Sequence, residues 1–502
     1  MGSMENARLP EESPGTEESQ PFTALPRRVH LLGAGGAGVS GVGRILASRG
    51  GRVSGHDRAG SQMFDALEEL GFPLELGESR ASSLPADVEL VVRSAAVPPE
   101  DPQVVAALER GIPVLKYAEV LQRLARPERT LAVAGTHGKT TASWMLWYAL
   151  EGIAEARGGP VAGALIGGIC RRLSTNALGG SRGAWFCFEA CEYDRTFLHL
   201  SPRGAIVTNV EEDHLDYYHS FDNIQRAFAC FLDEVASDGL IVLGREVPEA
   251  VELGGRDTEI WRLGRELEVD LEGEERGRFR FRLRGPGWAT PPVQLAVPGH
   301  FNVENAALSI GLAIGLSARV LRLDPSTLAE SAALGVERFL GVHRRFEPWG
   351  SRSGVDVVHD YAHHPTEVRV TIEAALRSFP GRLLHVLFQP HQHSRTSRFL
   401  EAFADSLRAA DRVVVADVYG ARKHLDGVQY AGARELVQAL AQRRVEAVEG
   451  GPLASSVQRF VSGLPAGEAR ATALVLGAGD VELVRESLLD GIAQRCTSRG
   501  TA

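Results

Sequence analysis

The chain has 502 residues, enough for about three domains of ordinary size. Apolar residues make up 44% and charged residues 24%, and the net charge of −10 argues against a dedicated nucleic-acid-binding protein. We find no uninterrupted apolar stretch of about 18 residues and no apolar core of a signal peptide, so no membrane span is predicted. The five cysteines are sparse and lack metal-finger spacing, which favours a reducing cytoplasm.

The first 26 residues are rich in Glu, Ser and Pro and are predicted to form a disordered tail. Apolar runs then alternate with helical segments as far as residue 126, which predicts a parallel α/β domain. The first apolar run, Val29–Leu32, leads into a glycine-rich turn in which Gly33, Gly35 and Gly38 match G-x-G-x-x-G. Asp57 follows about 20 residues later, where an acid often meets a ribose hydroxyl. The pattern predicts a site for a nucleotide diphosphate.

A second glycine-bearing turn follows the buried apolar run Leu131–Ala134 and precedes a predicted helix. Such a turn presents backbone N–H groups to phosphate, Lys139 can reach the outer phosphates and the Thr140 hydroxyl can hold Mg²⁺. Val133 stands where the full motif has glycine, so the loop is a shortened variant. The predicted phosphate loop comprises Gly135, Thr136, His137, Gly138, Lys139, Thr140 and Thr141.

Acidic residues follow the next two predicted strands, at 184–188 and 204–208. Because parallel strands end at one edge of a sheet, Glu189 and His214 are expected to face the phosphate loop. Glu189 with Thr140 supplies the oxygen ligands that Mg²⁺ prefers, whereas histidine is a less expected ligand for this ion. Further along, residues 264–297 predict a hairpin and residues 302–316 predict a helix of small residues.

The last third of the chain continues the strand–helix alternation and contains three dense basic clusters, at 341–346, 359–366 and 388–396. Their paired histidines raise the possibility of a zinc site, but no carboxylate–histidine spacing such as HExxH accompanies them. Binding of a transferred phosphate or a carboxylate by His and Arg is the favoured interpretation.

These motifs occur in an order that resembles the Mur ligases, specifically the branch that adds alanine, from about Arg27 to Asp480. The resemblance implies a Rossmann-like N-terminal domain for a UDP substrate (27–126), a central P-loop ATPase domain with a mostly parallel sheet (127–337) and a Rossmann-like C-terminal domain (338–502). It also implies ATP- and Mg²⁺-dependent joining of L-alanine to the lactyl carboxylate of UDP-N-acetylmuramate through an acyl phosphate. The implied setting is the cytoplasm, with a monomer or weak homodimer.

Site roles are carried over from this resemblance position by position. Thr140, Glu189 and His214 match metal-binding positions, and Asn305, Arg345 and Asp360 resemble residues that contact the nucleotide. His363, His391 and Arg395 resemble the region that meets the acyl phosphate and the incoming alanine. Together with Lys139, implied to stabilise the transferring charge, and His214 they form the implied catalytic set. Those implied at the UDP substrate are Gly33, Gly35, Gly36, Gly38, Asp57 and Ser94.

Two positions depart from the family pattern: Gln392 lies where many relatives place Arg, and the segment 189–194 differs from the Asp-rich form, which leaves the role of Glu192 open. No lysine lies between Lys139 and Lys423, so the carbamylated lysine of other branches has no counterpart here.

The alternatives to alanine ligation are a ligase that recycles murein tripeptide onto the same sugar nucleotide, a non-catalytic nucleotide-binding regulator, and a dinucleotide-dependent oxidoreductase. The last would leave the ATP-type loop unexplained.

Overall fold

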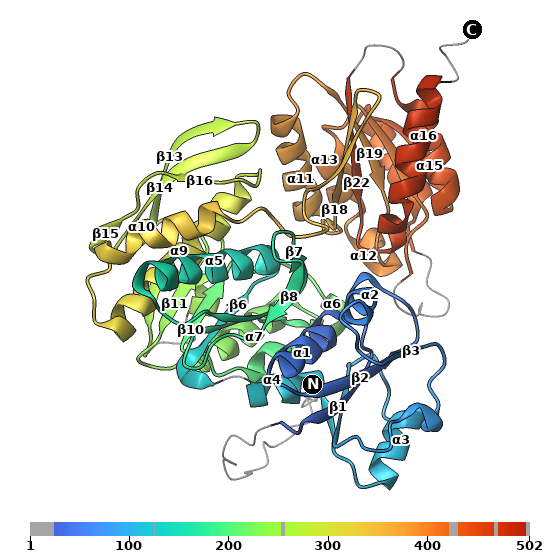
Figure 1. Cartoon of the computed structure of the whole chain (residues 1–502). Coiled ribbons are helices and arrows are strands. Elements are labelled where there is room, and N and C mark those ends of the chain that lie inside the picture. Colours follow the sequence, from blue (N-terminus) through green and yellow to red (C-terminus); the bar gives the residue numbers. More distant parts are fainter. Residues whose placement is uncertain (1–24, 125, 253–256, 421–429, 466–469, 498–502) are drawn as a thin grey trace, which may run out of the picture.

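The computed structural model describes residues 25–124, 126–252, 257–420, 430–465 and 470–497. Figure 1 shows three bodies, with the first domain in blue, the central one in green to yellow and the third in orange to red. Each is built on its own mainly parallel sheet, as the strand–helix alternation predicts. The predicted boundaries at 126 and 337 remain predictions, and residues 1–24 of the predicted tail lie outside the described part.

The first domain has a five-stranded sheet in the order β3-β2-β1-β4-β5, and every neighbouring pair is parallel. Its strands are β1 (Arg28–Leu32), β2 (Arg52–Asp57), β3 (Leu74–Leu76), β4 (Leu90–Arg93) and β5 (Val114–Lys116). Its helices are α1 (Ala37–Ser48), α2 (Gln62–Glu68), α3 (Pro102–Glu109) and α4 (Tyr117–Leu124).

The central sheet runs β12-β11-β10-β6-β9-β7-β8, and only the β7–β8 pairing at its edge is antiparallel. The middle strands are buried throughout and almost entirely apolar because helices cover both faces of the sheet. The strands are β6 (Thr130–Ala134), β7 (Gly163–Cys170), β8 (Thr175–Leu178), β9 (Phe186–Glu189), β10 (Gly204–Val207), β11 (Leu240–Leu243) and β12 (Glu259–Arg262).

The helices of the central domain are α5 (Lys139–Arg157), α6 (Leu215–Tyr218), α7 (Phe221–Asp233), α8 (Glu249–Glu252), α9 (Phe301–Leu321) and α10 (Ser326–Glu337). By length and composition, α9 is apolar enough to cross a membrane. However, 83% of its most apolar window is buried, and it packs against α5, α10 and the sheet. Helix α9 therefore has the surroundings of a core helix.

The charged segment predicted as a hairpin forms β13 (Glu268–Glu275) and β14 (Arg278–Gly285), extended by β15 (Trp288–Ala289) and β16 (Val293–Gln294). Along β14, Phe279, Phe281 and Leu283 are buried and the arginines between them are exposed, as period-two alternation requires. The hairpin reaches the third domain, where Glu274 pairs with Arg377 at 2.6 Å.

The third sheet runs β17-β18-β22-β19-β20-β21, with only the β17–β18 pair antiparallel. Its strands are β17 (Glu347–Arg352), β18 (Val355–Asp360), β19 (Leu383–Phe388), β20 (Arg412–Ala416), β21 (Glu446–Gly451) and β22 (Ala471–Leu476). Its helices are α11 (Pro365–Ser378), α12 (His393–Arg398), α13 (Leu400–Leu407), α14 (Ala433–Gln442), α15 (Leu453–Gly463) and α16 (Arg485–Thr497).

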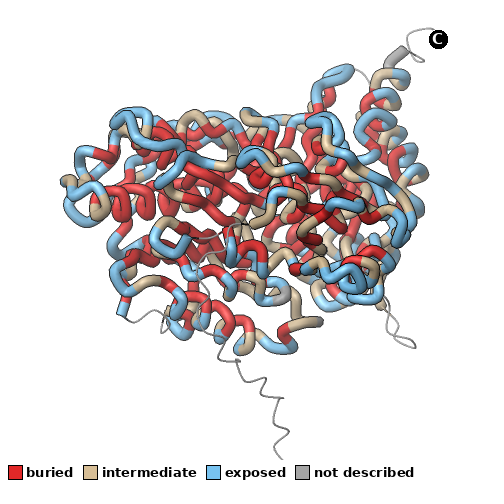
Figure 2. The backbone as a smooth tube through the Cα atoms, turned by 60° about the horizontal axis from the view of Figure 1, so that its bottom comes forward, coloured by how far each residue is buried: buried red, intermediate tan, exposed pale blue. Residues whose placement is uncertain are grey.

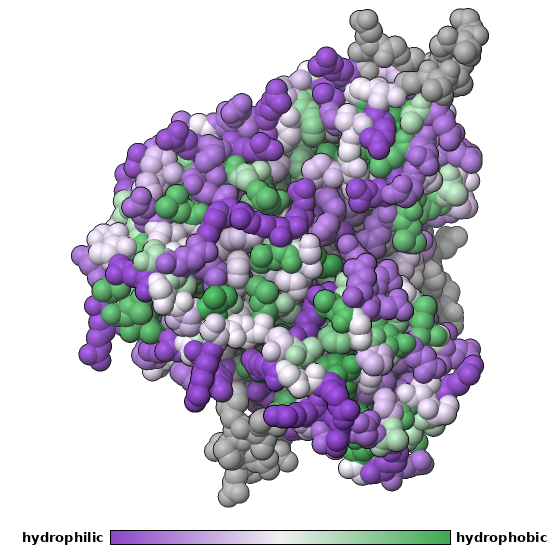
Figure 3. Space-filling view, viewed as in Figure 1, coloured by the Kyte–Doolittle hydropathy of each residue, from purple (hydrophilic) through white to green (hydrophobic). Residues whose placement is uncertain are grey.

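The first two domains share one apolar core, whereas the third domain has cores of its own. Helix α1 packs directly on β7 and β8, and a Cβ at Gly41 would lie 2.2 Å from Leu165. Asn176, fully buried on β8, donates to the Ala37 carbonyl oxygen at 2.8 Å. Buried positions run through all three bodies in Figure 2, and Figure 3 shows hydrophobic side chains only in scattered patches on one face.

Candidate active site

The phosphate loop connects β6 to α5 and has a backbone that only glycine accepts readily at two positions. Gly135 has φ +136°, and a Cβ there would lie 2.0 Å from the Thr208 hydroxyl oxygen. Gly138 has φ +83°, and a Cβ there would lie 2.7 Å from Asn305 Oδ1. The loop therefore runs against β10 and α9 with no room for side chains at these two points.

Residues after β10 hold the loop in shape. The Thr208 hydroxyl donates to the His137 carbonyl at 2.5 Å, and Asn209 both accepts from His137 N at 2.9 Å and donates to its carbonyl at 3.1 Å. Thr136 Oγ1 accepts from Glu211 N at 2.9 Å. These bonds fix the conformation of the phosphate loop through the protein's own side chains.

Lys139 starts α5 with its ammonium group folded back over the loop. Its Nζ donates to the carbonyls of Gly135 (2.6 Å) and Thr136 (3.0 Å) and lies 2.9 Å from Glu192 Oε2. Burial alone would lower the pKa of Lys139, but the Glu192 carboxylate outweighs it and raises that pKa above its usual value. Glu192, whose role the sequence left open, is thus the counter-ion of this lysine.

The residues expected to hold a metal gather beside Lys139. Thr140 Oγ1 donates to Glu189 Oε1 at 2.9 Å, and Glu189 Oε2 accepts from Gly167 N at 2.7 Å. His214 Nε2 lies 3.9 Å from Glu192 Oε1, and its buried Nδ1 has no hydrogen-bond partner. His214 also has a left-handed backbone, φ +50°, which is uncommon outside glycine and often found at functional sites.

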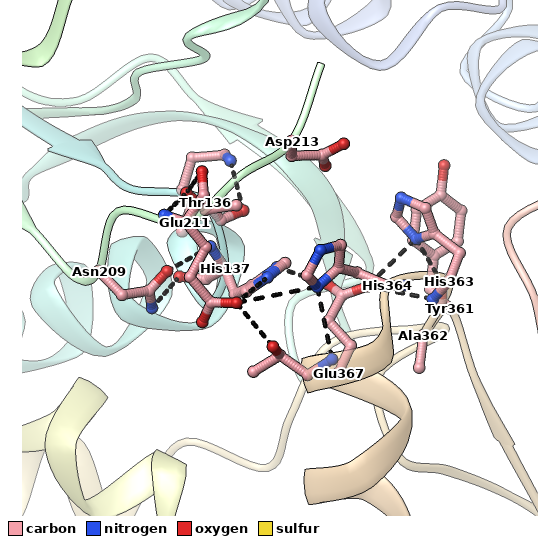
Figure 4. Close-up of polar contacts among 12 residues, drawn as sticks. Thr136, His137, Asn209, Glu211, Asp213, Tyr361, Ala362, His363, His364 and Glu367 are labelled. Atoms are coloured by element: carbon pink, nitrogen blue, oxygen red, sulfur yellow. Dashed lines mark hydrogen bonds and ion pairs between the residues drawn. The ribbon is translucent and has the colours of Figure 1, made fainter. Parts of the chain in front are cut away.

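A cluster of polar side chains joins the loop to the third domain (Figure 4). His137 lies between two carboxylates: its Nε2 is 3.7 Å from Glu211 Oε2 and its Nδ1 is 3.4 Å from Glu367 Oε1. Burial disfavours a charged His137, but both carboxylates oppose this effect and raise its pKa to about 9. Thr366, in the first turn of α11, donates to Glu211 at 2.6 Å. The interface is therefore charged and hydrogen-bonded.

Potential ligand atoms of His137, Glu211 and His364 lie within 4.8 Å of one another, which bears on the zinc interpretation. However, Thr366 already donates to the Glu211 oxygen that faces both histidines. The raised pKa of His137 also means that its ring carries a proton where a metal would bind. We interpret the cluster as an ion-pair network.

Arg345 and Asp360, expected at the nucleotide, approach this network from the third domain. Arg345 Nη1 pairs with Glu367 at 3.3 Å, and its guanidinium lies 5.2 Å from the centre of the Tyr361 ring. Asp360 ends β18 and accepts from the backbone N–H groups of Phe346 (2.7 Å) and Ala362 (2.8 Å). Its burial raises the pKa of Asp360 to about 6.

The groups expected at the incoming amino acid lie near one another. The His363 and His391 rings are 5.5 Å apart, and burial lowers their pKa values to about 3 and about 4. Arg395 lies 3.3 Å from His391 Nδ1 and forms a buried ion pair with Asp213 of the central domain at 2.6 Å. Arg395 therefore already holds a carboxylate, as expected of a residue that recognises one.

A cavity of about 1060 Å³ opens between the central and third domains above the loop, large enough for a nucleotide. Its wall includes residues that the sequence assigned to ATP, namely His137, Gly138, Thr140, Thr141, Asn305, Arg345 and Asp360. Asn305 lies at its floor against Gly138 and donates to Asn302 at 3.2 Å.

The glycine-rich turn of the first domain is a separate site that the structure also makes compact. Gly33 has φ +77°, and a Cβ there would lie 2.8 Å from Ser94 Cβ. Gly35 N donates to Asp57 Oδ2 at 2.7 Å, so Asp57 braces the turn. Gly36 is the N-cap of α1, and a Cβ at Gly38 would meet the Tyr117 ring at 2.5 Å. Tyr117, which the sequence interpretation missed, covers this helix start.

The structure thus brings the predicted ATP, metal and amino-acid groups to one interdomain region and leaves the predicted UDP turn on the first domain. Sequence reasoning missed Asp213, Thr208 and Asn209 as contacts, and it missed Glu367. A signal for Glu367 was present: it stands three residues after His364, with proline between them, as the acid of a capping box does. Nothing in the sequence pointed to its contacts with the central domain.

Known proteins match the chain along nearly its whole length. Residues 28–129 match the Mur ligase family, catalytic domain, residues 133–313 the Mur ligase middle domain, and residues 344–486 the Mur ligase, glutamate ligase domain. A UDP-N-acetylmuramate–L-alanine ligase of Nocardia farcinica is 38% identical over 96% of this chain and 98% of its own.

Solved structures agree with this. The UDP-N-acetylmuramate–alanine ligase MurC of Thermotoga maritima superposes with a TM-score of 0.73 and is 25% identical, covering 93% of this chain and 99% of its own. A murein peptide ligase of Psychrobacter arcticus has a TM-score of 0.64 and 21% identity, covers 93% of this chain and 99% of its own, and shows the shared fold. The chain belongs to the Mur ligase family.

Proposed function

We propose that this protein joins L-alanine to the lactyl carboxylate of UDP-N-acetylmuramate at the expense of ATP, as a step in making peptidoglycan precursors. The observation that supports this most directly is the interface between the central and third domains, where His137 of the phosphate loop lies 3.4 Å from Glu367 and Arg395, beside His391, pairs with Asp213. The alanine-ligase names of relatives that match nearly the full length point the same way.

In the first step the lactyl carboxylate attacks the γ-phosphorus of ATP, giving an acyl phosphate and ADP. The loop's backbone N–H groups at the start of α5 face the phosphates. Lys139 leaves the Gly135 and Thr136 carbonyls for the phosphate oxygens, while Glu192 keeps it protonated. These groups orient ATP and neutralise the charge that develops during transfer.

In the second step the alanine amine attacks the acyl carbon, and the tetrahedral intermediate expels phosphate. The amine must first lose a proton. His363 is the proposed acceptor on geometric grounds: its Nδ1 donates to the Tyr361 carbonyl at 3.0 Å, which leaves Nε2 as the acceptor. Arg395 binds the alanine carboxylate in exchange for Asp213.

Mg²⁺ is the cation that the donor set suits, because Thr140 and Glu189 offer hard oxygen ligands close together. When bound, this ion would supply positive charge at the β- and γ-phosphate oxygens. His214, beside Glu192 with a free Nδ1, is the proposed additional ligand.

The murein-tripeptide ligase is the second candidate for this site, and the fold of such an enzyme superposes on this chain at 21% identity. The alanine-ligase relatives are more similar, at 31–39% identity, and favour alanine. The intact Lys139–Glu192 and Thr140–Glu189 pairs argue against a non-catalytic regulator. The cavity at an ATP-type loop argues against an oxidoreductase.

The deciding experiment is phosphate release with ATP, Mg²⁺ and UDP-N-acetylmuramate, supplied in turn with L-alanine, L-serine, glycine or the murein tripeptide. We expect L-alanine to give the highest kcat/KM. Faster turnover with the tripeptide would overturn the assignment, and binding of nicotinamide or flavin nucleotides at the glycine-rich turn would favour the oxidoreductase.

We also propose that the enzyme is cytoplasmic, is a monomer or weak homodimer, and binds neither nucleic acid nor membrane. Its proposed domains comprise residues 27–126, 127–337 and 338–502. The free thiols of Cys170, Cys187, Cys191 and Cys230 support a reducing compartment. Sedimentation of the purified protein tests the oligomeric state.

A further inference from the structure

The Glu367 carboxylate contacts more of the candidate site than its place in the sequence suggests. It is the third residue of α11 and is 8% exposed. One oxygen, Oε2, accepts from the backbone N–H groups of His363 (3.1 Å) and His364 (3.3 Å) and lies 3.2 Å from His363 Nδ1. The other, Oε1, lies 3.4 Å from His137 Nδ1 and 3.3 Å from Arg345 Nη1.

The contacts of Oε1 go beyond capping α11. A capping glutamate needs only the bonds to the backbone before the helix, and Oε2 makes those. Oε1 instead faces a ring nitrogen of the phosphate loop and a guanidinium expected at the nucleotide. One carboxylate therefore touches His137 of the ATP loop, Arg345 of the nucleotide cavity and His363 of the amino-acid site.

We propose that Glu367 is a positioning residue that aligns the ATP loop with the amino-acid site across the interface between the central and third domains. This inference rests on the proposed ligase function. Glu367 holds the His137 ring toward the phosphates, sets Arg345 over the cavity and keeps the Nδ1 proton of His363 away from the incoming amine.

The charges around His137 agree with this role. Glu211 faces its Nε2 from the central domain, Glu367 faces its Nδ1 from α11, and the His364 ring lies 4.7 Å away. The neighbouring histidines and Arg345 hold the pKa of Glu367 well below its usual value despite its burial. Removal of the Glu367 charge leaves His137 with Glu211 alone.

The kinetic test compares Glu367→Gln and Glu367→Asp with Glu435→Gln, a matched control at the third position of α14, where the exposed Glu435 carboxylate caps that helix by accepting from Gly432 N at 2.8 Å. We expect Glu367→Gln to raise the KM values for both ATP and L-alanine about 10-fold or more, the scale of a lost charged hydrogen bond. The KM for UDP-N-acetylmuramate and the control should stay close to wild type. Glu367→Asp, which keeps the charge on a shorter side chain, should recover part of the loss.

A second measurement needs no turnover. In full-length protein labelled with ¹⁵N-histidine, with the His137 signal assigned through His137→Gln, Glu367→Gln should lower the pKa of His137 by about one unit or more, since one of its two carboxylate partners is gone. Unchanged Michaelis constants with an unchanged His137 titration would overturn the proposal. So would equal losses for all three substrates or equal losses in the Asp and Gln variants. If wild-type protein fails to ligate alanine, the ligase assignment fails, while the titration still decides the role of Glu367.

Discussion

Lys139, the residue proposed to bind phosphate, has its positive charge oriented by the chain itself. Three oxygens of the chain, on Gly135, Thr136 and Glu192, surround its ammonium group. A phosphate that replaces the two carbonyls finds a cation that is desolvated and oriented, so little reorganisation is needed at the moment of reaction.

Replacing Lys139 by alanine should lower ligation by at least about 10³-fold, because charge stabilisers of transferring phosphate contribute on that scale. The measurement is steady-state phosphate release. Lys116→Ala, which removes an exposed lysine of the first domain, serves as the control and should retain normal turnover. Near-normal activity of Lys139→Ala would show that the phosphate-loop assignment is wrong.

At the scale of an element, the loop between β6 and α5 depends on close backbone contact with β10. Gly135 has a positive φ, and a Cβ added there would clash with Thr208. Gly158, just after α5, also has a positive φ of +63°, but a Cβ added there would have no atom within 4 Å. A comparison of Gly135, in the loop before α5, with Gly158, just after α5, therefore separates the effect of steric clash from that of backbone strain alone.

Gly135→Ala should weaken ATP binding about 10-fold or more, since the added methyl must displace Thr208 and with it the bond that holds the His137 carbonyl. Gly158→Ala should cost about 1 kcal/mol of stability from backbone strain and leave ATP affinity unchanged. Calorimetric titration with a non-hydrolysable ATP analogue measures the first effect and thermal melting the second. Equal ATP affinities of the two variants would contradict this account.

At the scale of the whole molecule, the cores define two cooperative bodies rather than three. The first and central domains share apolar side chains across α1, β7 and β8, while the third domain meets them through polar and charged contacts such as Arg395–Asp213 and Arg398–Glu212. Shared apolar burial couples unfolding far more strongly than a mainly polar interface does.

We therefore expect the first two domains to melt together. UDP-N-acetylmuramate should raise the melting temperature measured by tryptophan fluorescence. This is expected even though the predicted UDP turn is in the first domain and no tryptophan lies before Trp144. Circular dichroism of the same samples gives the melting of the whole chain. The sugar nucleotide could instead raise a melting temperature that circular dichroism detects and tryptophan fluorescence does not. That result would show that the first domain unfolds independently.

Local patterns were enough to predict many of the strands, the two glycine turns and the hairpin, because periodicity and turn chemistry act over a few neighbouring residues. Strands β7 and β8 were not predicted. The match of the apolar run Leu131–Ala134 with β6 and the alternation along β14 are examples of correct prediction. The partners of Glu367 and Asp213 could not be predicted in this way. They are set by how the third domain docks on the central one, over sequence separations of 182 residues for Arg395–Asp213.

The fusion of α1 to β7 and β8 has a consequence for substrate size. Because the glycine-rich turn at Gly33 and the phosphate loop at Gly135 belong to one rigid body, the span between them is set before any ligand binds. A molecule that binds at both points must match this fixed distance. A sugar nucleotide of another length would place its carboxylate short of, or beyond, the γ-phosphate. The third domain meets this body through polar contacts such as Arg395–Asp213, so it can shift without breaking a shared apolar core.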